Sequence, residues 1–198
     1  MKLDTSIDID VAEEVYNPAE DSFLLLKAVE VEPGQRVLEM GAGSGFVALH
    51  AAKTGAFVMA ADINPHAVDC VRWNALKNDL KVEVVRSDLF ENIPGVFDII
   101  VFNPPYLPDE ERTTAWVEHA WSGGKEGSEV AVRFLEEAWK HLAPRGQVYM
   151  ILSSIGGIMT VLRASRAHYA AELIDERKMF FEAVFAYRFR LKPSQPES

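Results

Sequence analysis

The residues best suited to carry chemistry form the run Asn103-Pro104-Pro105-Tyr106. The Asn103 side-chain oxygen and the Pro104 backbone carbonyl can accept hydrogen bonds from both N–H groups of a planar amide or amine, which aims the nitrogen lone pair at an electrophilic carbon. The two prolines fix φ, and Tyr106 offers an aromatic wall for a planar or positively charged group. The run therefore suits methyl transfer to such a nitrogen. Its structural alternative is an Asn-Pro turn after a buried strand.

A glycine-rich loop precedes this run and is suited to a nucleotide-like cofactor. Gly41, Gly43 and Gly45 lie between a predicted strand and a predicted helix, where glycine lets the backbone turn tightly and a ligand approach. Their spacing is G-x-G-x-G rather than the G-x-G-x-x-G of dinucleotide-binding loops. Glu39, just before the loop, would repel a pyrophosphate and attract an ammonium group. The loop therefore favours S-adenosylmethionine over NAD, with a plain tight turn as the alternative.

Two further acidic residues follow the next two predicted strands. Asp62 can accept both hydroxyls of a ribose, or it can cap the next helix, a role open to Asn64 as well. Asp88 can accept an adenine amino group while Leu89 packs on the ring, or it can be a surface turn residue. Because the carboxyl ends of parallel strands share one edge of a sheet, Glu39 and these two acids are expected in one cofactor site.

The elements that must position these residues follow from the hydrophobic pattern. Short apolar runs alternate with segments of helical period, which predicts a parallel sheet covered on both faces. The pattern alone predicts an α/β fold with a seven-stranded, mostly parallel sheet and an antiparallel last strand. Joined to the cofactor and reaction motifs, it is expected to be a Rossmann-like class I methyltransferase fold. Strands are predicted at 37–40, 57–61, 82–85, 97–102, 147–152, 173–179 and 183–191, and helices from Asn17, at 46–53, from Asn64, at 129–142 and from 157 to about 168.

Composition bounds the class of protein. The chain has 198 residues and a formal net charge of −10, which disfavours direct binding to nucleic acid. One cysteine and histidines without ligand spacing predict no metal site. No signal peptide or membrane span is visible, so a cytoplasmic protein is expected. Residues 1–192 are expected to form a single domain, with a disordered tail at 193–198.

The connection at 103–128 is longer than most strand-to-helix loops, and loops of this length are usually functional. Within it, Trp116, Trp121, Gly123 and Gly124 either shape a substrate slot or serve ordinary loop packing.

Six segments together resemble the HemK-related protein-glutamine methyltransferases, in particular the short archaeal and eukaryotic branch that acts on class-1 release factors. They are residues 16–26, 39–45, 62–65, 88–89, 103–106 and 120–127. The resemblance implies that Asn103 holds the amide of a glutamine in a Gly-Gly-Gln loop. It also implies a small zinc-binding activator subunit at the sheet edge near 81–85. The cofactor contacts it implies are Ser22, Glu39, Gly41, Asp62, Asp88, Leu89 and Asn103. The cofactor site is also expected to include Tyr16, Gly43 and Gly45.

Two other functions fit parts of the same pattern. An adenine-N6 or other nucleic-acid methyltransferase uses a similar motif on a flipped or single-stranded base. The other is a noncatalytic cofactor-binding assembly subunit, which is disfavoured because such a protein has little reason to keep both the intact glycine loop and the Asn103–Tyr106 run.

Overall fold

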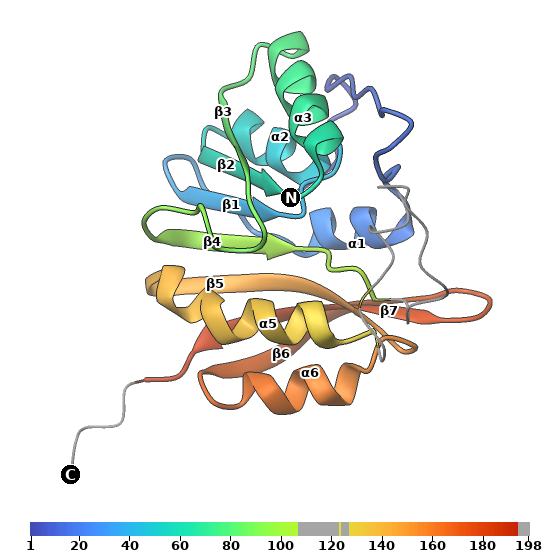
Figure 1. Cartoon of the computed structure of the whole chain (residues 1–198), viewed down its shortest axis with the longest axis vertical. Helices are drawn as coiled ribbons and strands as arrows, with labels where there is room; N and C mark the ends of the chain where they lie inside the picture. The colour runs from blue at the N-terminus through green and yellow to red at the C-terminus, as the bar shows by residue number, and fades with distance from the viewer. Residues whose placement is uncertain (107–122, 124–126, 194–198) are drawn as a thin grey trace.

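The computed structural model describes residues 1–106, 123 and 127–193. At its centre lies a seven-stranded sheet in the order β3-β2-β1-β4-β5-β7-β6 (Figure 1). Strands β1 to β5 are parallel, and β7 lies antiparallel between β5 and β6. The predicted sheet with its antiparallel last strand is thus confirmed. The strands are β1 (Arg36–Met40), β2 (Phe57–Asp62), β3 (Val82–Arg86), β4 (Phe97–Phe102), β5 (Leu142–Ser153), β6 (Tyr169–Lys178) and β7 (Ala183–Leu191).

Helices cover both faces of the sheet, as predicted (Figure 1). They are α1 (Glu20–Ala28), α2 (Phe46–Lys53), α3 (Pro65–Lys77), α5 (Glu129–Ala138), a 3-10 turn (Trp139–His141) and α6 (Ile158–Ser165). The alternation of side chains along β4 divides the core in two. Ile100 and Phe102 pack with α5 and α6, while Ile99 and Val101 pack with α1, α2 and α3.

Strand β4 is the element that places the candidate catalytic run. It lies between β1 and β5, and four consecutive residues, Ile99 to Phe102, are buried. Burial of each large aliphatic side chain stabilises the fold by about 1.5–3 kcal/mol. Because β4 ends at Phe102, Asn103 emerges from a rigid strand at the carboxyl edge of the sheet.

The predicted start of the first helix was wrong. Asn17 does not cap it; the N-cap is Ala19, and the Ser22 hydroxyl accepts a hydrogen bond from the Ala19 N–H at 3.4 Å. The segment before Ala19 is not part of the helix. Its residues Tyr16 and Pro18 line a cavity at the sheet edge instead.

The predicted helix at 129–142 was too long. It ends at Ala138, and Leu142 already belongs to β5, where it pairs with Phe97. The chain leaves the α-helix through the 3-10 turn at Trp139–His141, and Pro144 then disfavours a helical conformation at Ala143 within β5.

Several predictions fall on residues outside the described ranges. They concern the tail beyond residue 193, the segment 120–127 apart from Gly123 and Gly127, and the slot residues Trp116, Trp121 and Gly124. No helix within the described ranges is long and apolar enough to cross a membrane.

Candidate active site

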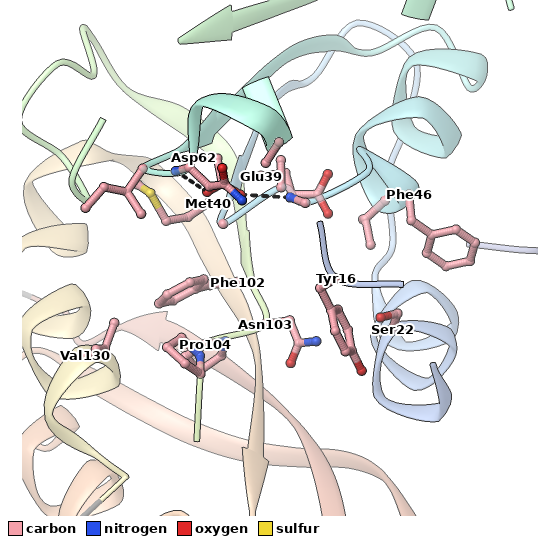
Figure 2. Close-up of a pocket in the computed structure, with 18 of the residues that line it drawn as sticks. Tyr16, Ser22, Glu39, Met40, Phe46, Asp62, Phe102, Asn103, Pro104 and Val130 are labelled. Carbon is pink, nitrogen blue, oxygen red and sulfur yellow. Dashed lines mark hydrogen bonds between the residues drawn. The ribbon is translucent and has the colours of Figure 1, made fainter. Parts of the chain in front are cut away.

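A cavity of about 460 Å³ opens at the carboxyl edge of the parallel strands (Figure 2). Its walls come from α1 and the segment before it, from the ends of β1, β2, β3 and β4, and from α5. All the predicted catalytic residues line it, and so do all the predicted cofactor residues except Gly45. These are Tyr16, Ser22, Glu39, Gly41, Gly43, Asp62, Asp88, Leu89, Asn103, Pro104, Pro105 and Tyr106. The residues predicted from the sequence therefore line one continuous cavity.

The glycine loop forms the floor between β1 and α2. Gly43 has φ +54°, and a Cβ there would lie no closer than 3.9 Å to other protein atoms, so it would stand in the cavity. Gly45 serves another purpose. It is the N-cap of α2 with φ +81°, and a Cβ would meet Val71 Cγ1 at 3.1 Å. Its absence from the cavity wall thus reflects a packing role.

A buried carboxyl group, that of Glu39, and a half-buried one, that of Asp62, flank the loop. Asp62 accepts hydrogen bonds from the backbone N–H groups of Gly43 and Asn64, both at 2.9 Å. Glu39 accepts one from the Ala48 N–H at 2.7 Å. Burial raises the pKa of Glu39 to about 8 and also raises the pKa of Asp62, and the backbone N–H groups oppose both shifts. A cation in this cavity would favour the ionised forms.

Asn64 is the cap of α3, because its side-chain oxygen accepts the His66 N–H at 2.9 Å. Asp62 is therefore not needed as the cap, and its carboxyl group faces the cavity.

The third acidic position has a different environment. Asp88 is partly exposed and pairs with Arg133 of α5 at 3.3 Å, and both residues line the cavity. Leu89 is buried with φ +45°, a conformation uncommon for a branched side chain. The hydroxyl of Ser87 donates to the Leu89 carbonyl at 2.7 Å and holds this turn in place. The turn thus offers an acceptor and an apolar surface side by side.

The carboxamide of Asn103 has a fixed orientation. Its Nδ2 donates to Oδ2 of Asp21 at 2.9 Å, and a carboxylate can only accept, so the nitrogen must face Asp21. Its Oδ1 is buried and has no hydrogen-bond partner within the described residues. Figure 2 places this side chain between Pro104 and Tyr16. An unpaired buried acceptor costs about 1–3 kcal/mol, and a bound N–H donor would remove that cost.

Asp21 is the residue that sequence reasoning missed. It is 3% exposed, and its Oδ1 accepts from the Tyr16 hydroxyl at 2.9 Å and the Ser22 N–H at 2.7 Å. Its Oδ2 accepts from Asn103 and, at 3.4 Å, from the Tyr106 hydroxyl. The pKa values of both tyrosines are raised, first by burial and then by the nearby Asp21, so both stay protonated donors. One carboxylate thus ties together three walls of the cavity.

These residues fit S-adenosylmethionine. The cavity has acidic groups for an ammonium group and a ribose, and an apolar turn with an acceptor for adenine. It also has an acceptor-lined end beside Asn103. Among the described residues no group of three His, Cys, Asp or Glu side chains is arranged to hold a metal ion. The sheet order and the site define a class I, S-adenosylmethionine-dependent methyltransferase.

Comparisons with known proteins agree with this class. Residues 19–180 match the family model of the methyltransferase small domain, and the chain belongs to that family. It is 39% identical over 180 residues to "Putative protein N5-glutamine methyltransferase MJ0928" of Methanocaldococcus jannaschii, which covers 89% of this chain and 91% of that one. It is also 39% identical over 125 residues to the release factor glutamine methyltransferase of Deinococcus radiodurans, covering 59% of this chain and 45% of that one.

A solved structure shares the fold at lower identity. It is the complex of E. cuniculi Mtq2 with Trm112, described as responsible for methylation of the eRF1 translation termination factor. The TM-score is 0.72 at 24% identity, and the match covers 90% of this chain and 99% of that one. The predicted resemblance to glutamine methyltransferases is confirmed by the sequence relatives.

Proposed function

We propose that this protein transfers a methyl group from S-adenosylmethionine to the side-chain amide nitrogen of a glutamine in a protein. The favoured acceptor is the Gly-Gly-Gln loop of a class-1 translation release factor. The observation that carries the proposal is the buried Asn103 Oδ1, an acceptor in the cavity that has no hydrogen-bond partner among the described residues. A primary amide supplies the N–H donor that this oxygen lacks. The relatives named as glutamine methyltransferases support the same acceptor.

The chain's own residues position the amide rather than deprotonate it. Asn103 Oδ1 and the Pro104 carbonyl accept its two N–H groups, and Tyr106 covers its planar face. The cofactor supplies an electrophilic methyl carbon. The amide nitrogen would become acidic only as it gains the methyl group, so its proton could leave to water and these residues need supply no general base. Positioning of two substrates in this way supplies much of the rate enhancement.

Each cofactor-facing residue has a proposed role. Glu39 attracts the ammonium group, Asp62 accepts the ribose hydroxyls, and Asp88 with Leu89 holds the adenine. The part of the cavity between these groups is lined by Tyr16, Ser22, Gly41 and Gly43.

A direct assay tests the proposed reaction. Purified enzyme, with any activator subunit, is incubated with a release factor and S-adenosylmethionine labelled in the methyl group. We expect label on the wild-type factor and none on a factor whose Gly-Gly-Gln glutamine is replaced. Label that survives that replacement would refute the acceptor. A structured RNA in place of the factor should stay unlabelled, in line with the net charge of −10.

We expect cofactor affinity to rise with pH because of Glu39. With its pKa raised to about 8, this group is neutral in the free protein at lower pH, and it must ionise to pair with an ammonium group. The same raised pKa means that its contribution to stability is full below the ordinary value of 4.5 and is lost as pH rises through about 8. Calorimetry should show the Kd falling by up to about tenfold per pH unit as pH rises toward 8.

Glu39→Gln is the matched control, because it keeps the shape and removes the titration. Its cofactor Kd should be nearly independent of pH in that range. An equal slope in the wild type and in this variant would show that another group titrates.

We also propose an activator subunit on the free edge of β3, at residues 81–85. β3 is an end strand of the sheet, and an unpaired strand edge is a natural template for another chain. The large apolar side chains of Phe57, Trp73 and Leu76, on neighbouring elements, are exposed. The solved neighbour is a complex with a second subunit. The further proposals are that this subunit binds zinc and that the enzyme acts in the cytoplasm.

A further inference from the structure

We propose that the tip of the β6–β7 hairpin, defined as residues 179–182, is a docking contact for the protein substrate. This rests on the proposed function and adds to it the surface that captures the substrate. The two central residues of the tip, Phe180 and Phe181, are 91% and 88% exposed, the most exposed large apolar side chains of the described chain. Their rings contact each other edge to face at 4.6 Å between centroids.

Local folding physics does not require phenylalanine at these positions. The Met179 N–H donates to the Glu182 carbonyl at 2.8 Å, which closes a two-residue turn. Such turns favour glycine, asparagine and aspartate. Two exposed phenylalanines add nothing to the core and expose apolar area to water. Exposed apolar surface of this kind marks a contact with a partner.

The tip lies on the catalytic side of the sheet. β7 pairs antiparallel with β5, and Val184 is opposite Ser153 at the carboxyl end of β5, so the turn projects beyond the edge where the cavity opens (Figure 1). The Ser153 hydroxyl donates to the Glu182 carboxylate at 2.7 Å. The negative charge of Glu182 is close enough to raise the pKa values of Tyr16 and Tyr106.

The hairpin is also fixed to the segment that carries Asp21. Arg177 of β6 forms an ion pair with Glu20 of α1 at 2.8 Å, and Asp175 pairs with Lys27 at 2.7 Å. Ion pairs therefore connect the hairpin that carries the docking contact to the helix that carries Asp21. A protein seated on the tip can present a loop to Asn103 without rearrangement of the sheet.

The chemistry favours a protein with an apolar depression beside its acceptor loop. A membrane is disfavoured because the net charge is −10 and the nearby cations Arg177 and Lys178 are paired with Glu20 and Glu176. A second copy is disfavoured because stable dimers bury more than two side chains can supply. A transient enzyme–substrate contact with aromatic hot spots is of the right size.

The test compares two acceptors for one variant. Phe180→Ala/Phe181→Ala should raise KM for the folded release factor by at least about tenfold, the loss expected for aromatic hot spots. kcat/KM for a short peptide containing the Gly-Gly-Gln glutamine should stay within about twofold, since a peptide does not reach the tip, and cofactor Kd should not change. Leu173→Ala, on the same hairpin but 46% exposed in mid-strand, is the matched control and should leave both acceptors unaffected.

The outcomes separate this inference from the proposed function. No glutamine-dependent label with the wild-type enzyme would overturn the proposed function and, with it, the inference. Wild-type labelling with an unchanged KM in the double variant would overturn the inference alone. So would an equal loss on factor and peptide, which would indicate a damaged cavity. If the wild type changes from dimer to monomer on dilution and the double variant does not, the tip would be a contact with a second copy of the chain. If the wild type binds anionic vesicles and the double variant does not, the tip would be a membrane contact instead.

Discussion

Asn103→Ala is expected to lower kcat by about 10²–10³-fold, the usual loss when one preorganised hydrogen-bonding group is removed from a reacting centre. The amide of the acceptor would lose the Oδ1 that orients one N–H, while Pro104 and Tyr106 would remain. Removal of the carboxamide takes one donor from the buried Asp21 but also removes the unpaired Oδ1. Because each of these costs about 1–3 kcal/mol, the two changes in the free energy of unfolding should largely cancel.

Steady-state kinetics on the release factor and a thermal melt together check this result. Asn78→Ala is a matched control, because Asn78 also makes side-chain hydrogen bonds, to Asp8 and Asn74, but lies outside the cavity wall. The control should lose some stability and keep its turnover. Wild-type kcat in Asn103→Ala would refute the catalytic role of this side chain.

Much of the site could be predicted because its residues follow strands that the pattern reveals. The run 97–102, apolar apart from Asp98, predicted β4 with its observed bounds, and the motif after it therefore lies at the sheet edge. The bounds of α2 and β7 were likewise correct, since glycines or a change of hydrophobic period mark their ends. Polar residues directly after parallel strands could then be placed together without knowledge of any contact.

Asp21 could not be predicted by the same reasoning. An acidic residue in the first turn of a helix has a sufficient explanation in the helix dipole, and Glu20 beside it looks the same in the sequence. Glu20 pairs with Arg177, whereas Asp21 turns inward to meet Asn103, which is 82 residues away in the chain. Only the docking of α1 against the end of β4 distinguishes the two acids. Gly45 is the opposite case. Its place in the motif suggested a ligand contact, but the structure requires glycine there because a side chain would collide with Val71.

Asp21→Asn is expected to lower the rate of amide methylation strongly although it preserves size and shape. The atom at the Oδ1 position must stay an acceptor, because the backbone N–H of Ser22 donates to it at 2.7 Å. The new amide nitrogen must then occupy the Oδ2 position and face Asn103 Nδ2. Two donors would oppose each other, so the Asn103 carboxamide would turn over and present its nitrogen to the cavity.

The cavity would then offer a donor where the substrate amide also offers a donor. We expect kcat to fall by about 10²-fold or more, with cofactor Kd changed far less, because Glu39 and Asp62 are untouched. If Asp21 only filled space or held the tyrosines, the isosteric variant would keep most of its activity. The ratio of kcat loss to cofactor Kd change, from kinetics and calorimetry, therefore separates orientation from support.

Exchange of the two side chains provides the rescue. In Asp21→Asn/Asn103→Asp, the amide nitrogen at 21 donates to one carboxylate oxygen at 103, and the other oxygen faces the cavity as an acceptor again. This pair should recover at least about tenfold in kcat over either single variant, because Asn103→Asp alone places two carboxylates in contact. A double variant no more active than the singles would show that Asp21 does not act through the orientation of residue 103. The Asp21 carboxylate thus determines that Asn103 presents its oxygen to the substrate amide, although Asp21 itself need not touch the substrate.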